Sequence, residues 1–275
     1  MTNYFPVAVI AGTGLANAFT SIPGTRSEEL VVTKNDFGGP IIYHEITGCL
    51  KFILIERHNV TGEYLCPHQI NYASYMRLLY EKGVRYIFAT SAVGGLNRPM
   101  FPEQLQVGSL VVPVDFIDKT GRPATFSGAG YRHSTAYYRS ARQLFCLEMA
   151  KLYPDSEVIR GGVYTNITGP RYETPAELVN FCLDPAVRVL GMTAAYEAAL
   201  AREISAHYSL TTIIADLPLE EPSVQGVAVE KAIAQAKDKV VRLIFSAISR
   251  LSQVNIQDWP CDCAKQPSVF EMLRQ

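Results

Sequence analysis

The sequence predicts an α/β protein, a single-domain three-layer sandwich around a mixed, mostly parallel β-sheet. Apolar runs of strand length alternate along the chain with segments of helical period, which is typical of a parallel sheet covered by helices. Two of these runs, 41–46 and 51–56, flank the turn Thr47–Leu50, which predicts a hairpin and some antiparallel pairing. No Ser/Gly/Pro-rich run or block of charge interrupts the 275 residues, so we expect one domain over 1–275 with 256–275 as a C-terminal tail.

Each expected element follows from its local pattern. Tyr72–Lys82 places its apolar side chains on one stripe of a helix, and Gln225–Leu251 is long enough to be the final helix. The expected helices are Tyr72–Lys82, Arg139–Leu152, Ala194–His207 and Gln225–Leu251. The expected strands are the apolar runs Val7–Ala11, Ile41–Ile46, Lys51–Glu56, Val84–Thr90, Gly108–Val114, Gly161–Asn166, Val187–Met192 and Thr211–Ala215.

The composition argues against several classes of protein. With 48% hydrophobic and 19% charged residues, the chain can bury a sizeable core and is poor material for disorder. A formal net charge of -1 gives no support to a nucleic-acid or membrane-surface partner. The N-terminus enters the first expected strand directly, and no apolar run approaches the roughly 20 residues that span a bilayer. We therefore expect a cytoplasmic protein.

The cysteines give little support to a metal site. Four of the six are scattered among apolar neighbours, which is typical of small buried side chains. Cys261 and Cys263 form a Cys-x-Cys pair in the polar tail after Trp259, with no second pair or histidine nearby in the sequence. One such pair is weak evidence for zinc. We expect no metal, and interpret the pair as surface thiols that have no role or are redox-labile.

Three expected strands end in the same way, with a hydroxyl residue beside small residues. The segments are Val7–Leu15, Val84–Leu96 with its glycine-rich end Thr90–Leu96, and Val187–Thr193. Free backbone N–H groups in a glycine-rich turn hold anions, and the carboxyl ends of parallel strands meet at one edge of a sheet. The pattern predicts a pocket for phosphate and a polar ligand.

The turn Gly12–Gly14 also suggests a dinucleotide-binding fingerprint. This fingerprint requires a small residue three positions after the second glycine, but here that residue is Asn17. The acidic residue that the fingerprint needs on a following strand is also missing at the right distance. A turn whose Thr13 hydroxyl and N–H groups face an oxyanion fits better, and a purely structural turn is the other interpretation.

Charged residues occupy two further strand ends. Arg57 and His58 directly follow the run 51–56. Arginine grips phosphate oxygens in a bidentate fork, and histidine adds a neutral or charged donor. An Arg-His pair is usually part of a solvated loop, and here its place at a strand end favours ligand binding. Asp216 ends the run 211–215, where it either faces the ligand or caps the chain.

Two expected helix starts carry polar side chains. Before the first, Tyr172 offers a flat face for stacking and Glu173 a carboxylate acceptor, in a stretch that is also typical of an ordinary helix entry capped by Thr174 and Glu177. Both interpretations can hold together. Before the second, the Thr193 hydroxyl is well placed for an anion.

Glu197 lies in the first turn of that second helix. Buried near a sugar, it would be a strong acceptor for a ribose hydroxyl. As a plain first-turn acid, it would only favour the helix dipole.

Taken together, these segments resemble the trimeric purine nucleoside phosphorylase and 5′-methylthioadenosine phosphorylase family. The resemblance runs from Val7 to about Ala247, and at least six motifs occur in the family's order. It implies a homotrimer and six phosphate-binding residues, which are Thr13, Arg57, His58, Ser91, Ala92 and Thr193.

The resemblance also implies residues around the nucleoside. Met192 would lie against the ribose, Tyr172 and Glu173 at the base, and Asp216 at the purine N7 and the 6-substituent. His133, in the loop 126–138, is similar to the histidine that reaches over the 5′ end of the sugar in this family. That histidine would come either from the same subunit or from the neighbouring one.

The reaction implied is reversible phosphorolysis of the N-glycosidic bond. Phosphate would attack C1′ as the purine leaves, and Asp216, protonated or sharing a proton with N7, would be the general acid for the leaving base. The resemblance implies no metal or organic cofactor, with inorganic phosphate as co-substrate.

The identity of the base is left open by two conflicting signals. Family members that prefer 6-oxopurines usually carry Asn at the position of Asp216, which points to adenine here. Glu173 resembles the acceptor of the N1–H of a 6-oxopurine, and Pro218 stands where adenine-specific members have a second acid.

The 5′ side favours a methylthio group. None of the five histidines lies near the start of the last helix, where ordinary nucleoside phosphorylases bind the 5′-hydroxyl, and Val224–Ala228 is apolar. We expect 5′-methylthioadenosine as the substrate. The alternatives are a 6-oxopurine nucleoside or 5′-methylthioinosine and, outside the enzymes, a non-catalytic nucleoside-binding protein.

Overall fold

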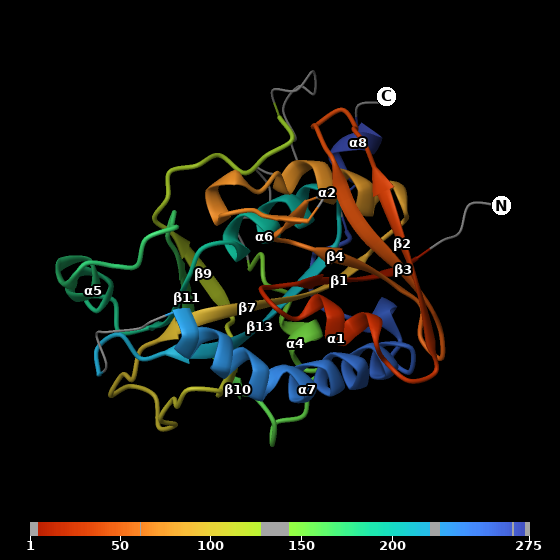
Figure 1. The fold of residues 1–275 in the computed structure, drawn as a ribbon. Coiled ribbons are helices and arrows are strands. Elements are labelled where there is room, and N and C mark those ends of the chain that lie inside the picture. Colours follow the sequence, from red (N-terminus) through yellow and green to blue (C-terminus); the bar gives the residue numbers. More distant parts are fainter. Residues whose placement is uncertain (1–4, 61, 128–142, 221–225, 266, 273–275) are drawn as a thin grey trace.

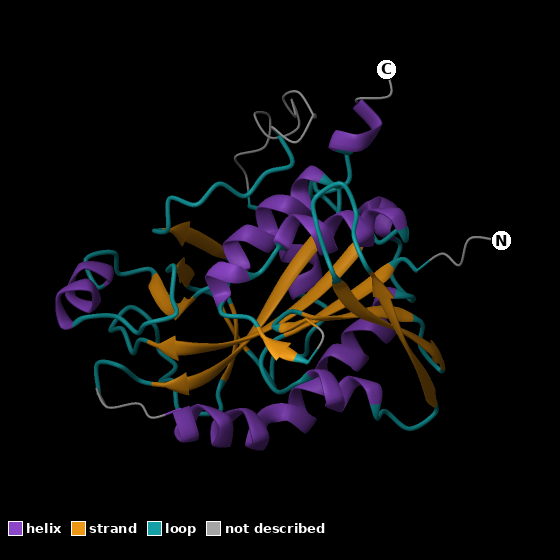
Figure 2. Cartoon of the chain, turned by 45° about the horizontal axis from the view of Figure 1, so that its top comes forward, coloured by secondary structure: helices purple, strands orange, loops and turns teal. Residues whose placement is uncertain are grey.

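The computed structural model describes residues 5–60, 62–127, 143–220, 226–265 and 267–272, and its centre is one eleven-stranded mixed sheet. Figures 1 and 2 show helices on both faces of this sheet, with α2 and α6 on one side and α1 and α7 on the other. The predicted three-layer α/β fold is therefore confirmed. In the described part of the chain, no helix is long and apolar enough to cross a membrane.

The strands of the large sheet are β1 (Val7–Ala11), β2 (Thr25–Val32), β3 (Ile41–Gly48), β4 (Phe52–Glu56), β7 (Tyr86–Gly95), β8 (Leu110–Val112), β9 (Asp115–Asp118), β10 (Ile159–Arg160), β11 (Val163–Asn166), β12 (Val187–Gly191) and β13 (His207–Asp216). Two short strands, β5 (Asn59–Val60) and β6 (Glu63–Tyr64), pair separately. The helices are α1 (Ala16–Thr20), α2 (Tyr72–Glu81), α4 (Leu147–Ala150), α5 (Pro175–Phe181), α6 (Ala194–Glu203), α7 (Gly226–Leu251) and α8 (Val269–Met272), with 3-10 turns η1 (Pro67–Gln69) and η2 (Ile256–Asp258).

The middle of the sheet is parallel. β1 lies between β4 and β7, and β7 pairs with β13, all in parallel. The expected hairpin of β3 and β4 is present and antiparallel, and it is extended by β2, which the apolar pattern did not predict because most of its side chains are exposed. The carboxyl ends of β1, β4, β7 and β13 therefore meet at one edge.

Two apolar cores lie on opposite faces of the sheet. In β1, Ala8 and Ile10 belong to the core under α2 and α6, whereas Val7, Val9 and Ala11 belong to the core under α7. This alternation follows from the two-residue period of a strand. A strand buried on both faces is apolar throughout, which is why these central strands were recognised as apolar runs.

The glycine-rich stretch after Thr90 is strand rather than turn, so this expectation was wrong. β7 continues through Gly94 and Gly95, which pair with β12. A Cβ on Gly95 would lie 2.9 Å from the side chain of Ile214. The glycines therefore allow close approach between strands, a role that sequence alone does not distinguish from a turn.

Two expected helices were too long. Of Arg139–Leu152, residues 139–142 lie outside the described part, and within the rest only α4 is helical. α6 ends at Glu203 because Ser205 adopts a left-handed φ of 58°, after which His207 begins β13. Serine is not typical of that conformation, so no residue at this point predicts the end of the helix.

The residues after α7 pack onto the fold. Phe270 in α8 is buried and lies against Tyr80 of α2, with ring centroids 4.8 Å apart. Cys263 is buried and Cys261 half-buried, so the expectation of a surface thiol pair in a polar tail was wrong.

Candidate active site

A cavity of about 290 Å³ lies at the edge where the central parallel strands end. Its wall includes every predicted site residue that the structure describes. His133 is not among the described residues. The predicted residues in the wall are Thr13, Arg57, His58, Ser91, Ala92, Tyr172, Glu173, Met192, Thr193 and Asp216. The prediction that separate strand ends converge is therefore confirmed.

Hydroxyl groups line one part of this cavity. Thr193 is the N-cap residue of α6, and its backbone N–H donates to the Tyr164 hydroxyl at 3.1 Å. The Thr193 side chain does not cap the helix, and its buried Oγ1 has no hydrogen-bond partner within the described residues. A buried hydroxyl beside a helix N-terminus is suited to an anionic ligand, because that end of the helix carries partial positive charge.

Arg57 also lines the cavity, but its guanidinium is already engaged. Nε and Nη2 donate to the two carboxylate oxygens of Glu197, at 2.5 and 2.9 Å, and Nη1 donates to the backbone oxygen of Thr90 at 2.6 Å. The expected bidentate fork is therefore held by a carboxylate of the protein. Burial alone would lower the pKa of Arg57, but the Glu197 charge outweighs it and holds that pKa above its usual value.

Glu197 accepts four hydrogen bonds and is fully buried. Besides Arg57, the hydroxyls of Tyr75 and Tyr208 donate to it at 2.7 and 2.6 Å. Neither suggestion made for Glu197 from the sequence describes this environment, since it contacts the arginine rather than the cavity and is more than a first-turn acid. Four donors offset the cost of burying its charge.

His58 presents an acceptor to the cavity rather than the expected donor. Its Nδ1 lies 2.9 Å from the backbone oxygen of Leu65, which can only accept, so Nδ1 carries the proton. Burial and then the Arg57 charge lower the pKa of His58 to about 4. The imidazole is therefore neutral at pH 7, and its Nε2 accepts.

Asp216 is the last residue of β13 and is aimed by an irregularity in the sheet. The pairing of β13 with β7 shifts between Ile214 and Asp216, so that one extra residue of β13 faces the glycine end of β7. Such bulges redirect a side chain, frequently beside active sites. Burial raises the pKa of the Asp216 carboxyl to about 6.

Glu173 faces the same cavity from the loop before α5. Burial raises its pKa, and the Asp216 carboxylate adds to the shift. The predicted capping box is confirmed, because Thr174 and Glu177 bond each other's backbone N–H groups at 3.3 and 2.8 Å. Gly169 has a left-handed φ of 65°, which residues with a Cβ rarely adopt, so glycine lets the chain turn here beside the cavity.

Tyr64 and Val229 also line the cavity, although neither was predicted as a site residue. Tyr64 stacks on His58, with ring centroids 5.0 Å apart and planes at 3°, and its hydroxyl lies 3.5 Å from the Thr13 Oγ1. Val229, near the start of α7, adds an apolar side chain. Tyr64 lies in β6, a two-residue exposed strand too short to show a period, so no sequence signal marks it. Val229 continues the apolar stretch at the start of the last helix.

The model of the phosphorylase superfamily matches residues 7–249. The chain belongs to this superfamily. This chain is 36% identical over 214 residues to the probable S-methyl-5'-thioinosine phosphorylase of Methanothermobacter thermautotrophicus, and the match covers 76% of this chain and 71% of the relative. It is 30% identical over 277 residues to the S-methyl-5'-thioadenosine phosphorylase of Geobacter sulfurreducens, covering 96% and 91%.

The same likeness extends to solved structures. The phosphorylase matches a methylthioadenosine phosphorylase sourced from an antarctic soil metagenomic library with a TM-score of 0.72 and 25% identity, covering 91% of this chain and 88% of that one. The family resemblance predicted from the sequence is therefore confirmed.

Proposed function

We propose that this phosphorylase converts 5′-methylthioadenosine and inorganic phosphate into adenine and 5-methylthioribose 1-phosphate. The observation that carries the proposal is that a single cavity combines hydroxyl groups at a helix N-terminus with a buried carboxyl whose pKa is about 6. The first suits an anionic nucleophile and the second a leaving group that needs a proton.

Phosphate binds against Thr13, Ser91, Ala92 and Thr193, with the Arg57 side chain as part of the wall. Because Glu197 compensates the Arg57 charge, the neutral hydroxyls and backbone groups contribute most of the hydrogen bonds to phosphate. A neutral His58 accepts a hydrogen bond from the O–H of a protonated phosphate. A phosphate oxygen attacks C1′, the C1′–N9 bond breaks, and its electron pair goes to the purine.

Asp216 stabilises the departing base. In its protonated form one oxygen donates to N7, and the other oxygen accepts from a 6-amino group, so both atoms of the carboxyl match adenine. The proton moves to N7 as charge develops on the ring. Val229 offers apolar contact of the kind that a methylthio group needs, and the relative from Geobacter sulfurreducens carries the name of this activity.

A second candidate is phosphorolysis of 5′-methylthioinosine. Glu173 favours it, because a carboxylate in this cavity would accept the N1–H of a 6-oxopurine. The name of the relative from Methanothermobacter thermautotrophicus points the same way. A non-catalytic nucleoside binder is disfavoured, because nucleoside binding alone gives no reason for hydroxyls arranged around a phosphate site.

The test is the release of free base from methylthioadenosine, methylthioinosine, adenosine and inosine, each with and without phosphate. We expect methylthioadenosine to have the largest kcat/KM and every reaction to require phosphate. A preference for methylthioinosine would establish the second candidate and assign base selection to Glu173. No reaction with any of the four would contradict the proposed activity.

The phosphate site yields a prediction at Thr193. Replacing Thr193 by Val keeps the shape of the side chain and removes the hydroxyl, so we expect the KM for phosphate to rise about 10- to 100-fold, because a hydrogen bond to a charged group contributes about 1.5–3 kcal/mol. Steady-state kinetics at varied phosphate would measure this. Thr193→Ser restores the hydroxyl and should recover most of the affinity, and an unchanged KM in Thr193→Val would remove Thr193 from the site.

We also propose a homotrimer that works in the cytoplasm with phosphate as its only co-substrate. The trimer and the co-substrate rest on the family resemblance. Light scattering on the eluting protein would measure the assembly, with a mass of three times 30.4 kDa expected. A monomer that is fully active would contradict the trimer as the working unit.

A further inference from the structure

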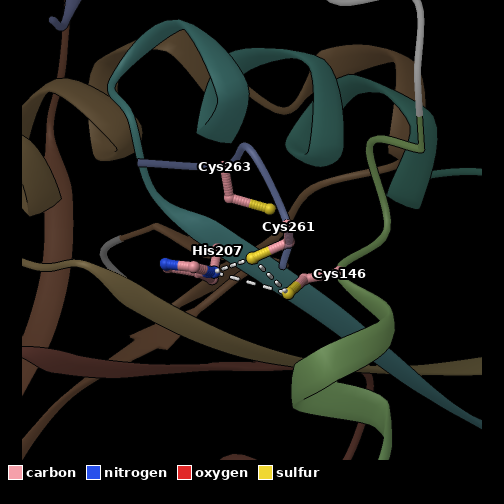
Figure 3. Close-up of side chains that lie close together, drawn as sticks. All are labelled: Cys146, His207, Cys261 and Cys263. Carbon is pink, nitrogen blue, oxygen red and sulfur yellow. Dashed lines mark hydrogen bonds between the residues drawn. The ribbon is translucent and has the colours of Figure 1, made fainter. Parts of the chain in front are cut away.

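Four side chains that bind metals in other proteins meet at the opposite edge of the sheet from the active site. Cys146 directly precedes α4, His207 is the first residue of β13, and Cys261 and Cys263 follow η2. Their ligand atoms all lie within 4.8 Å of one another. Figure 3 shows one ring nitrogen of His207 directed at the sulfur atoms of Cys146 and Cys261.

We propose that Cys146, His207, Cys261 and Cys263 bind one structural zinc ion. A tetrahedral zinc site has Zn–S bonds of about 2.3 Å and Zn–N bonds of about 2.0–2.1 Å, which place two sulfurs about 3.8 Å apart and sulfur and nitrogen about 3.6 Å apart. The Cys146 and Cys261 sulfurs are 3.9 Å apart. The His207 Nδ1 lies 3.4 Å from the Cys146 sulfur and 3.5 Å from the Cys261 sulfur. These three edges match a tetrahedron around zinc.

The chemistry of the donor set also selects zinc. Three thiols and one imidazole form a Cys₃His set, which is one of the structural zinc combinations and unsuited to magnesium or calcium. With four protein ligands the coordination is complete, so the ion needs no water or substrate. The ion therefore has a structural role.

The surroundings hold these ligands in place. The His207 ring stacks on Tyr86, with centroids 5.1 Å apart, and meets Trp259 edge-on at 5.1 Å. Asp262, between the two cysteines of the tail, accepts from Arg202 of α6 at 2.7 Å. Cys146, His207 and Cys263 are buried. Neighbours that fix the orientation of the ligands are typical of metal sites.

The proposed ion would join the C-terminal segment to the sheet. His207 and Asp216 stand at opposite ends of the ten-residue strand β13, which at about 3.3 Å per residue separates the zinc cluster from the active site by about 30 Å. Zinc binding adds to folding stability where the ligands come together only in the folded chain. We therefore expect zinc to raise stability and to leave turnover unchanged.

The Cys-x-Cys pair is weak evidence for zinc in the sequence, because its two partners are distant along the chain. Cys146 lies 115 residues and His207 lies 54 residues from Cys261. Zinc motifs are recognised from sequence when two pairs lie at short, regular spacing. Here the fold brings Cys146 and His207 next to Cys261 and Cys263. The proposed zinc site replaces the expectation of no metal.

The test is the zinc content of the protein, measured by elemental mass spectrometry. The protein is purified under reducing conditions from cells grown in zinc-supplemented medium. We expect about one zinc per chain in the wild type and in Cys49→Ser, whose exposed thiol lies outside the cluster. Cys261→Ser and Cys263→Ser should contain less than about a tenth as much. Wild-type protein with as little zinc as Cys261→Ser would overturn the proposal, as would a disulfide between any two cluster cysteines in that preparation.

A second measurement uses only the wild type, in case the variants do not fold. Protein refolded with cobalt(II) in place of zinc should show the thiolate charge-transfer and visible absorption bands of a tetrahedral cobalt site. Removal of zinc by a chelator should lower the melting temperature, while kcat/KM measured well below that temperature stays within about twofold. Absence of the tetrahedral cobalt bands would contradict the site.

Discussion

Replacing Asp216 by Asn is expected to lower kcat for methylthioadenosine by about 10²- to 10⁴-fold, the range for loss of a general acid. An amide keeps the shape of the side chain but has no acidic proton to give to N7. Because its NH₂ group donates where the carboxyl accepts, methylthioinosine should lose much less activity. The ratio of the two kcat/KM values is the measurement.

The same variant has a matched control. Asp238 is an exposed aspartate on α7, so Asp238→Asn makes the same chemical change outside the cavity and should leave both activities unaltered. If the ratio of kcat/KM for methylthioadenosine to kcat/KM for methylthioinosine is the same in Asp216→Asn and in the wild type, Asp216 does not select the base.

Asp216 also predicts the pH profile. Burial raises its pKa to about 6, so the protonated form that donates to N7 is present below that pH and is lost above it. We expect kcat/KM for methylthioadenosine, measured at saturating phosphate, to fall about tenfold per pH unit above about 6. Asp216→Asn should lack this limb of the profile. A wild-type profile that instead rises through pH 6 would mean that the ionised carboxylate is the active form.

Replacing Glu197 by Leu is expected to destabilise the protein by about 3–5 kcal/mol, because it leaves the buried Arg57 charge without its partner. The Tyr75 and Tyr208 hydroxyls lose their acceptor in the same step. The free energy of unfolding, measured with urea, would record the loss.

A double variant provides the control for this prediction. Removing both charges, in Arg57→Met with Glu197→Leu, should recover much of the stability that Glu197→Leu loses, because an apolar pair replaces the ion pair. Its affinity for phosphate should not recover if Arg57 belongs to the site. Additive losses of stability in the double variant would contradict the coupling of the two residues.

The convergence of the site was predictable from sequence because it follows from topology. β1, β4, β7 and β13 run parallel, so Thr13, Arg57, Ser91 and Asp216 had to come close to a common edge. Thr193 follows β12, which runs antiparallel to β7, so its place at the same cavity does not follow from parallel topology. Each was recognisable because it follows an apolar run, directly or, for Thr13, after one glycine.

The state of these groups was not predictable, because it depends on contacts between distant segments. Arg57 was recognised, but the carboxylate that holds its fork lies 140 residues away in Glu197. The direction of the His58 proton depends on the Leu65 oxygen, and the position of Asp216 on a bulge in β13. Periodicity contains no information about these contacts.

In the fold, too, the elements with a local sequence signal were predictable and those that depend on distant contacts were not. The buried central strands and the capping box of α5 have local signals and were found. β2 is largely exposed and lacks an apolar run, and the end of α6 depends on a left-handed Ser205. The four-ligand cluster arises only when α4, β13 and the C-terminal segment pack together.

In the proposed reaction, phosphate is the nucleophile at C1′. The most direct test follows methylthioadenosine and phosphate by ³¹P NMR while the free base is quantified. We predict a new sugar 1-phosphate signal that grows in equal amount with adenine, and no adenine without phosphate. Adenine released at the same rate without phosphate, with no new phosphorus signal, would show that water is the nucleophile and would contradict this account.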